Sequence, residues 1–306
     1  MEAMNLVSMK DILEKHFKDI YPDISFEDAK FPDNKNELLF PHLSSDEYDK
    51  YVVKKVKKGD GNPFDEIRKV NSSTTLAVYY FTLFVKLLGI KEEYFDFENK
   101  IGTPLNLEKV RQNYPNKPLP LRSANIDVLL KMDNTIWFIE SKFLEPYYSS
   151  TQCLSEKYLN IGNFGDNDKA GIWFKYAKEI NNHIEEYKFY NVTQMFKHLL
   201  AMYSHRKKWY DMGYPNFVLL NLGWKMTDSF KEKIESDRSR SYIKNREIKI
   251  AEQTERGINL LNNLIKELEW KDCKVVIKHY NDLELLGKIK DSPYYGGFTK
   301  RYLIED

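Results

Sequence analysis

The stretch that decides the fold runs from Asn125 to Glu145, NIDVLLKMDNTIWFIESKFLE. It consists of two apolar segments on either side of Asp133-Asn134. Asp and Asn tolerate the left-handed backbone that a two-residue hairpin turn needs, so the pattern predicts two antiparallel strands joined by a tight turn. Both faces of the predicted ribbon are largely apolar, which is typical of strands inside a sheet that is covered on both sides.

Three charged residues occupy unusual places in this ribbon. Pairing Met132 with Thr135 across the turn puts Asp127 directly opposite Glu140. Because side chains alternate between the two faces of a strand, Glu140 and Lys142 point to the same side. The register therefore predicts that Asp127, Glu140 and Lys142 form a cluster on one face of the sheet.

The chemistry of this cluster points to a metal ion. Two opposed carboxylates in an apolar strand pair repel each other and are costly to remove from water. A hard divalent cation such as Mg2+ or Mn2+ would offset that cost, because such ions take carboxylate oxygens and keep several waters. Lys142 could neutralise the cluster and position a water, and it would lose a proton more easily beside a metal. A structural ion pair is the alternative, but the apolar flanks favour the metal site.

Asp127 followed by Glu140-Ser141-Lys142 resembles the signature of the PD-(D/E)xK nuclease superfamily, whose core is the restriction-endonuclease-like fold. The string IESKFLEP is similar to one bacterial branch of that superfamily, and further matches are the serines at 72–73 and the segment QMFKH at 194–198. The resemblance covers about residues 64 to 222. It implies a Mg2+-dependent enzyme that hydrolyses phosphodiester bonds, with DNA as the expected substrate and endonuclease action as the expected mode.

The resemblance also implies a role for each residue of the cluster. Asp127 and Glu140 would bind the metal, and the backbone carbonyl of Ser141 would be a further oxygen ligand. Lys142 would orient or deprotonate the water that attacks the phosphate. These assignments make the hairpin the predicted catalytic centre.

A later helix carries three more candidates. Gln194, Lys197 and His198 lie at i, i+3 and i+4, on one side of a helix predicted from Val192 to about Tyr210. The resemblance implies that Gln194 hydrogen-bonds near Lys142 and that Lys197 or His198 meets a phosphate. A solvated helix face explains the same pattern equally well.

The helix predicted from Ser72 to Leu88 should pack against the sheet. Ser72 or Ser73 can cap its start, Gly89 closes it, and its side chains are apolar nearly all round. Many members of the superfamily carry an acidic residue in this helix, whereas here it holds none. Glu66, Asp96 or Glu98 could supply that carboxylate instead, and Glu98, in the next predicted strand, is the proposed further metal ligand. A solvent-facing strand residue is an equal alternative.

Around the hairpin the chain alternates helices and strands. Helices are predicted over about 169–188 and 192–210, followed by a short buried strand over 217–222. With the resemblance, this order predicts an α/β protein with a restriction-endonuclease-like core, a mixed central sheet with helices on both faces, and N- and C-terminal helical additions. The predicted regions are an N-terminal helical extension (1–63), a nuclease core (64–223), and a charged helical region (224–306) with a small β hairpin from 275–280 and 283–289.

Arg238, Arg240 and Arg246 belong to the densest basic segment of the chain. Such side chains can track a phosphate backbone, although a solvated helix face is nearly as good an explanation. The net charge of the whole chain is +1, which gives no electrostatic argument for a nucleic-acid partner. Any phosphate-binding surface must therefore be local.

Composition also bears on the compartment. Two cysteines are too few for a disulfide framework or a zinc cluster. The sequence has no run of 18 apolar residues and no signal-peptide pattern, which predicts a cytoplasmic protein without a membrane partner. We expect a nuclease that acts on double-stranded DNA, and a homodimer is left open. The alternatives are a non-catalytic nucleic-acid-binding member of the same fold and a structural protein whose cluster is an ion-pair network.

Overall fold

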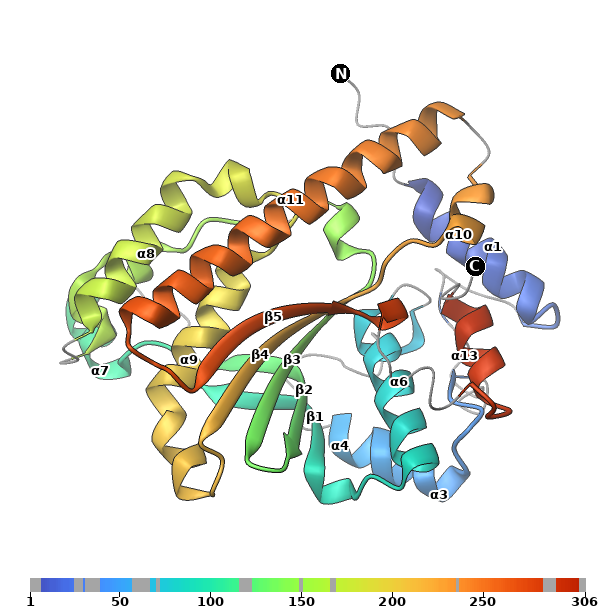
Figure 1. The fold of residues 1–306 in the computed structure, drawn as a ribbon, viewed down its shortest axis with the longest axis horizontal. Helices are drawn as coiled ribbons and strands as arrows, with labels where there is room; N and C mark the ends of the chain where they lie inside the picture. Colours follow the sequence, from blue (N-terminus) through green and yellow to red (C-terminus); the bar gives the residue numbers. More distant parts are fainter. Residues whose placement is uncertain are drawn as a thin grey trace.

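The computed structural model describes residues 7–24, 30, 39–56, 67–69, 72–115, 123–148, 151–165, 169–234, 237–282 and 290–302. Its centre is one sheet of five strands, which are β1 (Phe95–Gly102), β2 (Ala124–Met132), β3 (Thr135–Lys142), β4 (Asn216–Gly223) and β5 (Cys273–His279). The strands lie in chain order, with β1, β2 and β3 antiparallel and β3, β4 and β5 parallel. The predicted mixed sheet with helices on both faces is confirmed (Figure 1).

The predicted hairpin forms β2 and β3. Its described pairs run from Met132 opposite Thr135 to Val128 opposite Ile139, in the predicted register. Asp133 has a φ of 51°, so the turn uses the left-handed backbone that its sequence favours. The described pairing ends one step before Asp127 and Glu140.

One face of the sheet is covered by α6 (Ser73–Leu88). The Ser72 side chain accepts a hydrogen bond from the Thr75 amide, and the helix ends at Gly89 with a φ of 64°, so both predicted ends are confirmed. The helices α1 (Val7–Ile20) and α13 (Tyr295–Tyr302) complete this layer. Their apolar side chains belong to the same core as those of α6, as Phe17, Tyr79 and Phe298 show.

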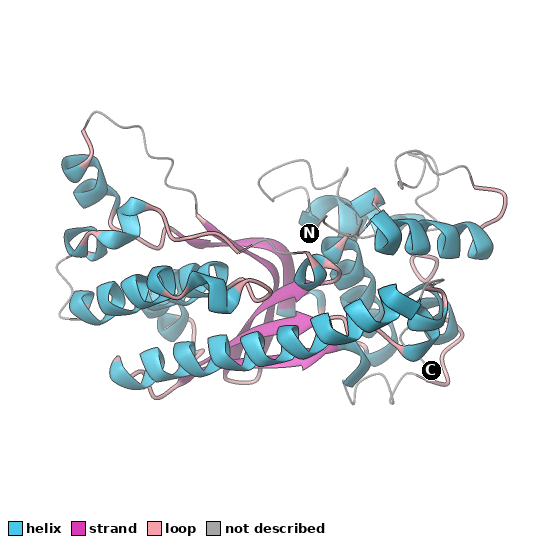
Figure 2. Ribbon diagram, turned by 90° about the horizontal axis from the view of Figure 1, so that it is seen from above, coloured by secondary structure: helices cyan, strands magenta, loops and turns pink. Residues whose placement is uncertain are grey.

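The opposite face packs against α9 (Val192–Asp211), which contacts β1, β2 and β4. Beside α9 lie α7 (Leu107–Asn113) and α8 (Ala170–Asn182), and the long α11 (Asp237–Glu267) packs on β5. Figure 1 shows α7, α8, α9 and the end of α11 on one side of the strands and α1, α6 and α13 on the other, with the beginning of α11 extending toward α1. In the view from above, α11 runs along the molecule past the sheet (Figure 2). The crossovers that parallel strands require are made by α8 and α9 between β3 and β4, and by α11 between β4 and β5.

The remaining segments are short. They are α3 (Ser45–Tyr48), a π-helical turn (Asp49–Val53), α4 (Lys54–Val56), α10 (Asp228–Glu232) and the 3-10 turns η2 (Glu92–Tyr94), η3 (Glu145–Tyr147), η4 (Glu156–Leu159), η5 (Ile161–Phe164), η6 (Ile184–Tyr187) and η7 (Tyr280–Asp282). Within the described ranges, no helix is both long enough and apolar enough to cross a bilayer.

The structure places the first half of the predicted C-terminal hairpin in the central sheet. Residues 273–279 pair in parallel with β4, and among the described residues β4 is their strand partner. The other half of the predicted hairpin, 283–289, lies outside the described residues. The central sheet thus includes a strand from the region after residue 223, which is where the predicted nuclease core ends. The alternating pattern of β5 suits pairing at an open sheet edge.

Candidate active site

Glu140 in β3 is the centre of the candidate site. The residue is 2% exposed, and both of its carboxylate oxygens accept hydrogen bonds. Oε1 lies 2.5 Å from Lys142 Nζ and 2.7 Å from Gln194 Nε2, while Oε2 lies 3.1 Å from His198 Nε2. Because an unpaired buried carboxylate is very costly, these three donors are what allow a charge at this position.

Asp127 is linked to the same strand through the backbone. Its Oδ2 accepts a hydrogen bond from the Ser141 amide at 2.7 Å. The next carbonyl along, that of Lys142, accepts from the Trp224 amide after β4. Since successive residues of a strand present their backbone groups to alternate neighbours, the Ser141 carbonyl faces β2, on the same side as its amide. The Asp127 carboxylate and the Ser141 carbonyl therefore both lie at the edge of β3 that faces β2.

The charges of the cluster depend on one another. Burial favours the neutral form of Glu140, but the Lys142 ammonium and the hydrogen bond from His198 outweigh it and hold the pKa of Glu140 below its usual range. Burial likewise disfavours the charged form of Lys142, but nearby carboxylates, that of Glu140 foremost, raise the pKa of Lys142 well above its ordinary value. Lys142 is thus a protonated hydrogen-bond donor at neutral pH, which suits the predicted role of orienting a water better than the predicted role of deprotonating it.

Two of the three residues predicted on α9 reach this cluster. Gln194 and His198, one turn apart, both contact Glu140. Gln194 lies near Lys142 because Glu140 Oε1 accepts a hydrogen bond from each of these two side chains. Asn191 caps the helix and donates to Gln194 Oε1 at 3.1 Å, so the amide is held in place. His198 is 3% exposed and lies against Glu140, not at a surface where a phosphate would meet it.

Lys197 lies apart from the cluster. Its ammonium is 5.7 Å from the centre of the Tyr158 ring, and burial, with a contribution from Lys157, lowers its pKa. A helix turns by about 100° per residue, so the step from Lys197 to His198 is enough to send the two side chains in different directions. Glu98 is in β1, but its side chain lies outside the described part of the chain. Its proposed role as a metal ligand stays a prediction.

The predicted arginines are all in the first part of α11. The side chain of Arg238 is outside the described part of the structure. Arg240 pairs with Asp237 one turn earlier, at 3.3 Å. The Arg246 guanidinium lies over the Phe189 ring, 4.1 Å from its centre. The two described arginines therefore already contact protein groups.

A cleft of about 710 Å³ opens beside Lys142. The last residues of three parallel strands, Lys142, Gly223 and His279, are neighbours in the sheet and line its floor. One wall is α11, and the other is formed by η3 and the segment before α9. Open α/β sheets characteristically bind ligands at the carboxyl ends of their parallel strands.

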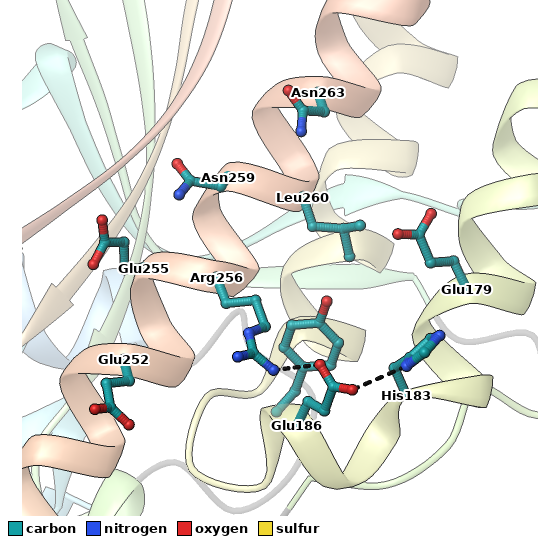
Figure 3. A pocket seen from close by; sticks show the side chains of 10 residues that line it. Glu179, His183, Glu186, Glu252, Glu255, Arg256, Asn259, Leu260 and Asn263 are labelled. Atoms are coloured by element: carbon teal, nitrogen blue, oxygen red, sulfur yellow. Dashed lines mark hydrogen bonds and ion pairs between the residues drawn. The ribbon is translucent and has the colours of Figure 1, made fainter.

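A second groove of about 570 Å³ lies between α11 and the end of α8 with η6 (Figure 3). Glu186 accepts from Arg256 and lies 3.0 Å from His183 Nδ1. Three more carboxylates line the groove, those of Glu179, Glu252 and Glu255. Their negative charge opposes phosphate binding, so the cleft beside Lys142 is the better candidate for a nucleic-acid site.

The oxygen ligands predicted from the sequence suit a hard divalent cation. No group of three or more His, Cys, Asp or Glu that could hold a metal occurs among the described residues. Mg2+, however, is commonly bound through one or two carboxylates together with waters and substrate phosphates. A carboxylate offers about four lone-pair positions, and the contacts to Lys142, Gln194 and His198 use three. Glu140 Oε2 thus retains one acceptor position for a cation, and the predicted further ligands are the oxygens of Asp127 and of the Ser141 carbonyl.

Sequence reasoning missed the residue that supports this strand from the other face. The Ser141 hydroxyl donates to the Ser73 carbonyl at 3.1 Å and lies 2.8 Å from the Tyr280 hydroxyl. Ser141 is therefore tied to both α6 and the turn that follows β5. Tyr280 was not detectable from its neighbours in the sequence, because it reaches Ser141 only once β5 has joined β4.

The fold and the cluster together define an α/β protein with a restriction-endonuclease-like core. Residues 5–302 match the sequence model of the family described as "Restriction Endonuclease associating with ARP". The chain belongs to this restriction endonuclease family, which bears out the resemblance found in the hairpin and suggests a DNA nuclease. Searches of curated proteins and of solved structures each gave no match.

Proposed function

We propose that the protein is a Mg2+- or Mn2+-dependent endonuclease that hydrolyses phosphodiester bonds in DNA. The observation that carries the proposal is the buried Glu140 carboxylate, held by Lys142, Gln194 and His198 at the edge of a cleft. Buried ionised groups with such strong mutual perturbation are concentrated at functional sites. Family membership supports DNA as the substrate.

Asp127, Glu140 and the Ser141 carbonyl would hold the metal. When bound, the ion would polarise the phosphate and supply a water of lowered pKa. The side chains of the protein itself position the water and the phosphate. Lys142, protonated beside Glu140, can donate a hydrogen bond to the attacking water or to a phosphate oxygen and stabilise the charge that develops there.

Gln194 and His198 are positioning residues in this scheme. They hold the Glu140 carboxylate from α9, so that its remaining lone pair stays directed at the cation. Phosphate contacts away from the cleavage point are assigned to the basic start of α11, with Arg238, Arg240 and Arg246. Replacing those three together should weaken DNA binding and flatten its salt dependence without abolishing cleavage at saturating substrate.

Lys142→Met tests the proposal. Wild-type protein should nick or linearise supercoiled plasmid in Mg2+ or Mn2+ but not in EDTA. The variant should cleave roughly 100-fold more slowly or worse, since charge stabilisation and water activation are each of that order. Its affinity for DNA should change little, because one lysine accounts for about one unit of salt slope. Lys178→Met, at an exposed position of α8, is the matched control and should cleave like wild type.

One outcome would contradict the proposed nuclease activity. If wild type and Lys142→Met bind DNA alike and neither cuts DNA or RNA with any divalent metal, the protein is a non-catalytic member of its fold. The cluster would then be an inherited but unused site.

A further inference from the structure

The cleft beside Lys142 is lined largely by apolar and aromatic side chains. Four aromatic residues contribute to it, namely Tyr147, Phe189, Tyr190 and Trp224. The charged residues along its lining balance, with three lysines (142, 225 and 231) and three glutamates (145, 247 and 255). Two of them, Lys231 and Glu247, pair with each other at 3.2 Å. Such an interior is poorly suited to a run of phosphates, which needs excess positive charge.

Small residues line part of the cleft. Gly223 lies in the floor between Lys142 and His279, and a Cβ there would stand 3.4 Å from His279 Cδ2. On the wall, Ala251 and Thr254 face the cleft from α11. The volume of about 710 Å³ lies within the range of about 300–1,000 Å³ that is usual for small-molecule sites.

Two buried polar groups in the cleft are poorly satisfied by the protein. Tyr190 is 3% exposed, and its hydroxyl has no hydrogen-bond partner in the described part of the chain. A buried tyrosine hydroxyl usually has one. Asn221 is 7% exposed, and the hydrogen bond described for its amide is a long one, 3.8 Å to Met195 Sδ. Both residues line the cleft, where the polar edge of a ligand could pair with them.

We infer that the cleft receives one unstacked nucleobase adjacent to the phosphate at Lys142. This inference rests on the proposed nuclease function and specifies its substrate. A nucleobase has flat apolar faces that stack on aromatic side chains and a polar edge that hydrogen-bonds. Its place next to the cleavage point follows from the position of Lys142, which belongs to both the cluster and the cleft.

This assignment restricts the substrate. A base inside a duplex is stacked and paired, so it can enter the cleft only if it is already single-stranded or is extruded. The preferred DNA is therefore a single strand, or a duplex with an unpaired or mismatched nucleotide at the point of cleavage. A fully paired duplex should bind more weakly, because extruding the base from the stack costs free energy.

The test measures binding without divalent metal, so that cleavage does not interfere. The probes are a short single-stranded oligodeoxynucleotide, its perfect duplex and the same duplex with one mismatch, each carrying 2-aminopurine. Ala251→Trp fills the cleft from an exposed helix position, and Phe189→Ala removes an aromatic wall. Glu252→Trp is the matched control, because Glu252 is the next exposed residue on α11 and faces the second groove.

The single strand should bind more tightly than the perfect duplex, with the mismatched duplex between them. Ala251→Trp and Phe189→Ala should each weaken single-strand binding by roughly 5- to 100-fold, the loss expected for one base stack, and should reduce the 2-aminopurine signal change. Glu252→Trp should bind like wild type. Melting curves of all variants establish that the folded state is retained.

The outcomes separate this inference from the proposed function. Equal binding of single strand and perfect duplex, or cleft variants that bind like wild type, overturns base uptake even if plasmid cleavage depends on Lys142. Cleft-dependent binding of single strands without cleavage under any metal keeps base uptake and overturns the nuclease. Binding of none of the three probes overturns base uptake alone, because plasmid cleavage in the presence of metal tests the nuclease separately.

Discussion

Glu140 carries a charge in the interior of the protein, stabilised by donors from two elements. Lys142 comes from its own strand, and Gln194 and His198 come from α9. Removing one donor from a buried charge is typically far more damaging than the pair was stabilising, because the remaining group stays desolvated. The arrangement is therefore sensitive to single substitutions in ways that surface ion pairs are not.

Glu140→Gln should make the protein less sensitive to acid. The pKa of Glu140 in the folded state is below its ordinary value of 4.5. The ionised form thus contributes stability that is complete above about pH 4.5 and is lost as the pH falls toward the folded-state pKa. Glutamine does not titrate, so the Tm of the variant should decline less over this acid range.

The matched control is Glu232→Gln, at an exposed position of α10, which should follow the wild-type curve. The measurement is the Tm at a series of pH values from neutral to about pH 3, below the range in which unpaired carboxylates titrate. If Glu140→Gln instead parallels wild type, the carboxylate is not held ionised by its donors.

Asp127→Asn should abolish stabilisation by metal. Mg2+ or Mn2+ that binds only the folded state raises the free energy of unfolding by about 2.7 kcal/mol at a hundredfold excess over Kd. Asparagine can still accept the hydrogen bond from the Ser141 amide, so the backbone contact survives while the metal loses a charged ligand. Thermal melts with and without metal give the answer. A wild-type Tm that is indifferent to millimolar metal would favour a structural ion-pair network.

At the scale of elements, α11 is positioned by one close approach. Gly257 lies in the middle of this helix, and a Cβ there would overlap the Tyr190 ring. Tyr190 is buried and lines the cleft, so the ring has little freedom to move aside. The contact brings α11 close to the chain that leads into α9, and both segments line the cleft.

Gly257→Ala should therefore destabilise the protein, although alanine normally favours a helix. The gain in helix propensity is about 1 kcal/mol, whereas overpacking of a filled site costs about 1–3 kcal/mol. Gly171→Ala is the matched control, because nothing lies within 4 Å of its Cβ position in α8, and it should be neutral or stabilising. Urea unfolding of both variants measures the difference. Equal stabilisation by the two substitutions would show that Tyr190 is not seated against α11.

At the scale of the whole molecule, the two ends of the chain share one core. Phe298 in α13 lies 5.2 Å from the Tyr79 ring in α6, and His16 in α1 contacts the Lys300 carbonyl at 2.7 Å. Trp224, just after β4, donates to the Tyr302 carbonyl at 2.8 Å. The helical additions therefore complete the layer that covers the sheet, and we expect the chain to unfold as one unit.

Phe298→Ala should lower the free energy of unfolding by about 3–5 kcal/mol, because a fully buried aromatic ring is lost from a packed core. The loss should appear in a single transition, observed alike by tryptophan fluorescence and by far-UV circular dichroism. Lys300→Ala, exposed on the same helix, should leave that transition unchanged. Two separate transitions would mean that the terminal helices fold independently of the sheet.

The hairpin and α6 could be predicted because their determinants are local. A left-handed turn at Asp133 sets the register, and a period of two then places the side chains of Glu140 and Lys142 on one face. The ends of α6 follow in the same way from a serine that caps its first turn and a glycine that ends it. None of these features depends on contacts with segments that are far away in the sequence.

The rest of the site depends on contacts between segments far apart in the sequence. Many residues of α9 are buried on several sides, so its polar pattern did not reveal that Gln194 and His198 face Glu140 while Lys197 does not. The strand that pairs with β5 could not be predicted either, since an alternating strand can pair with any open edge. The cleft between the sheet and α11 could not be predicted because it depends on that pairing. Helix rotation and strand partnership are chosen by the packing of the whole core, which no local stretch of sequence contains.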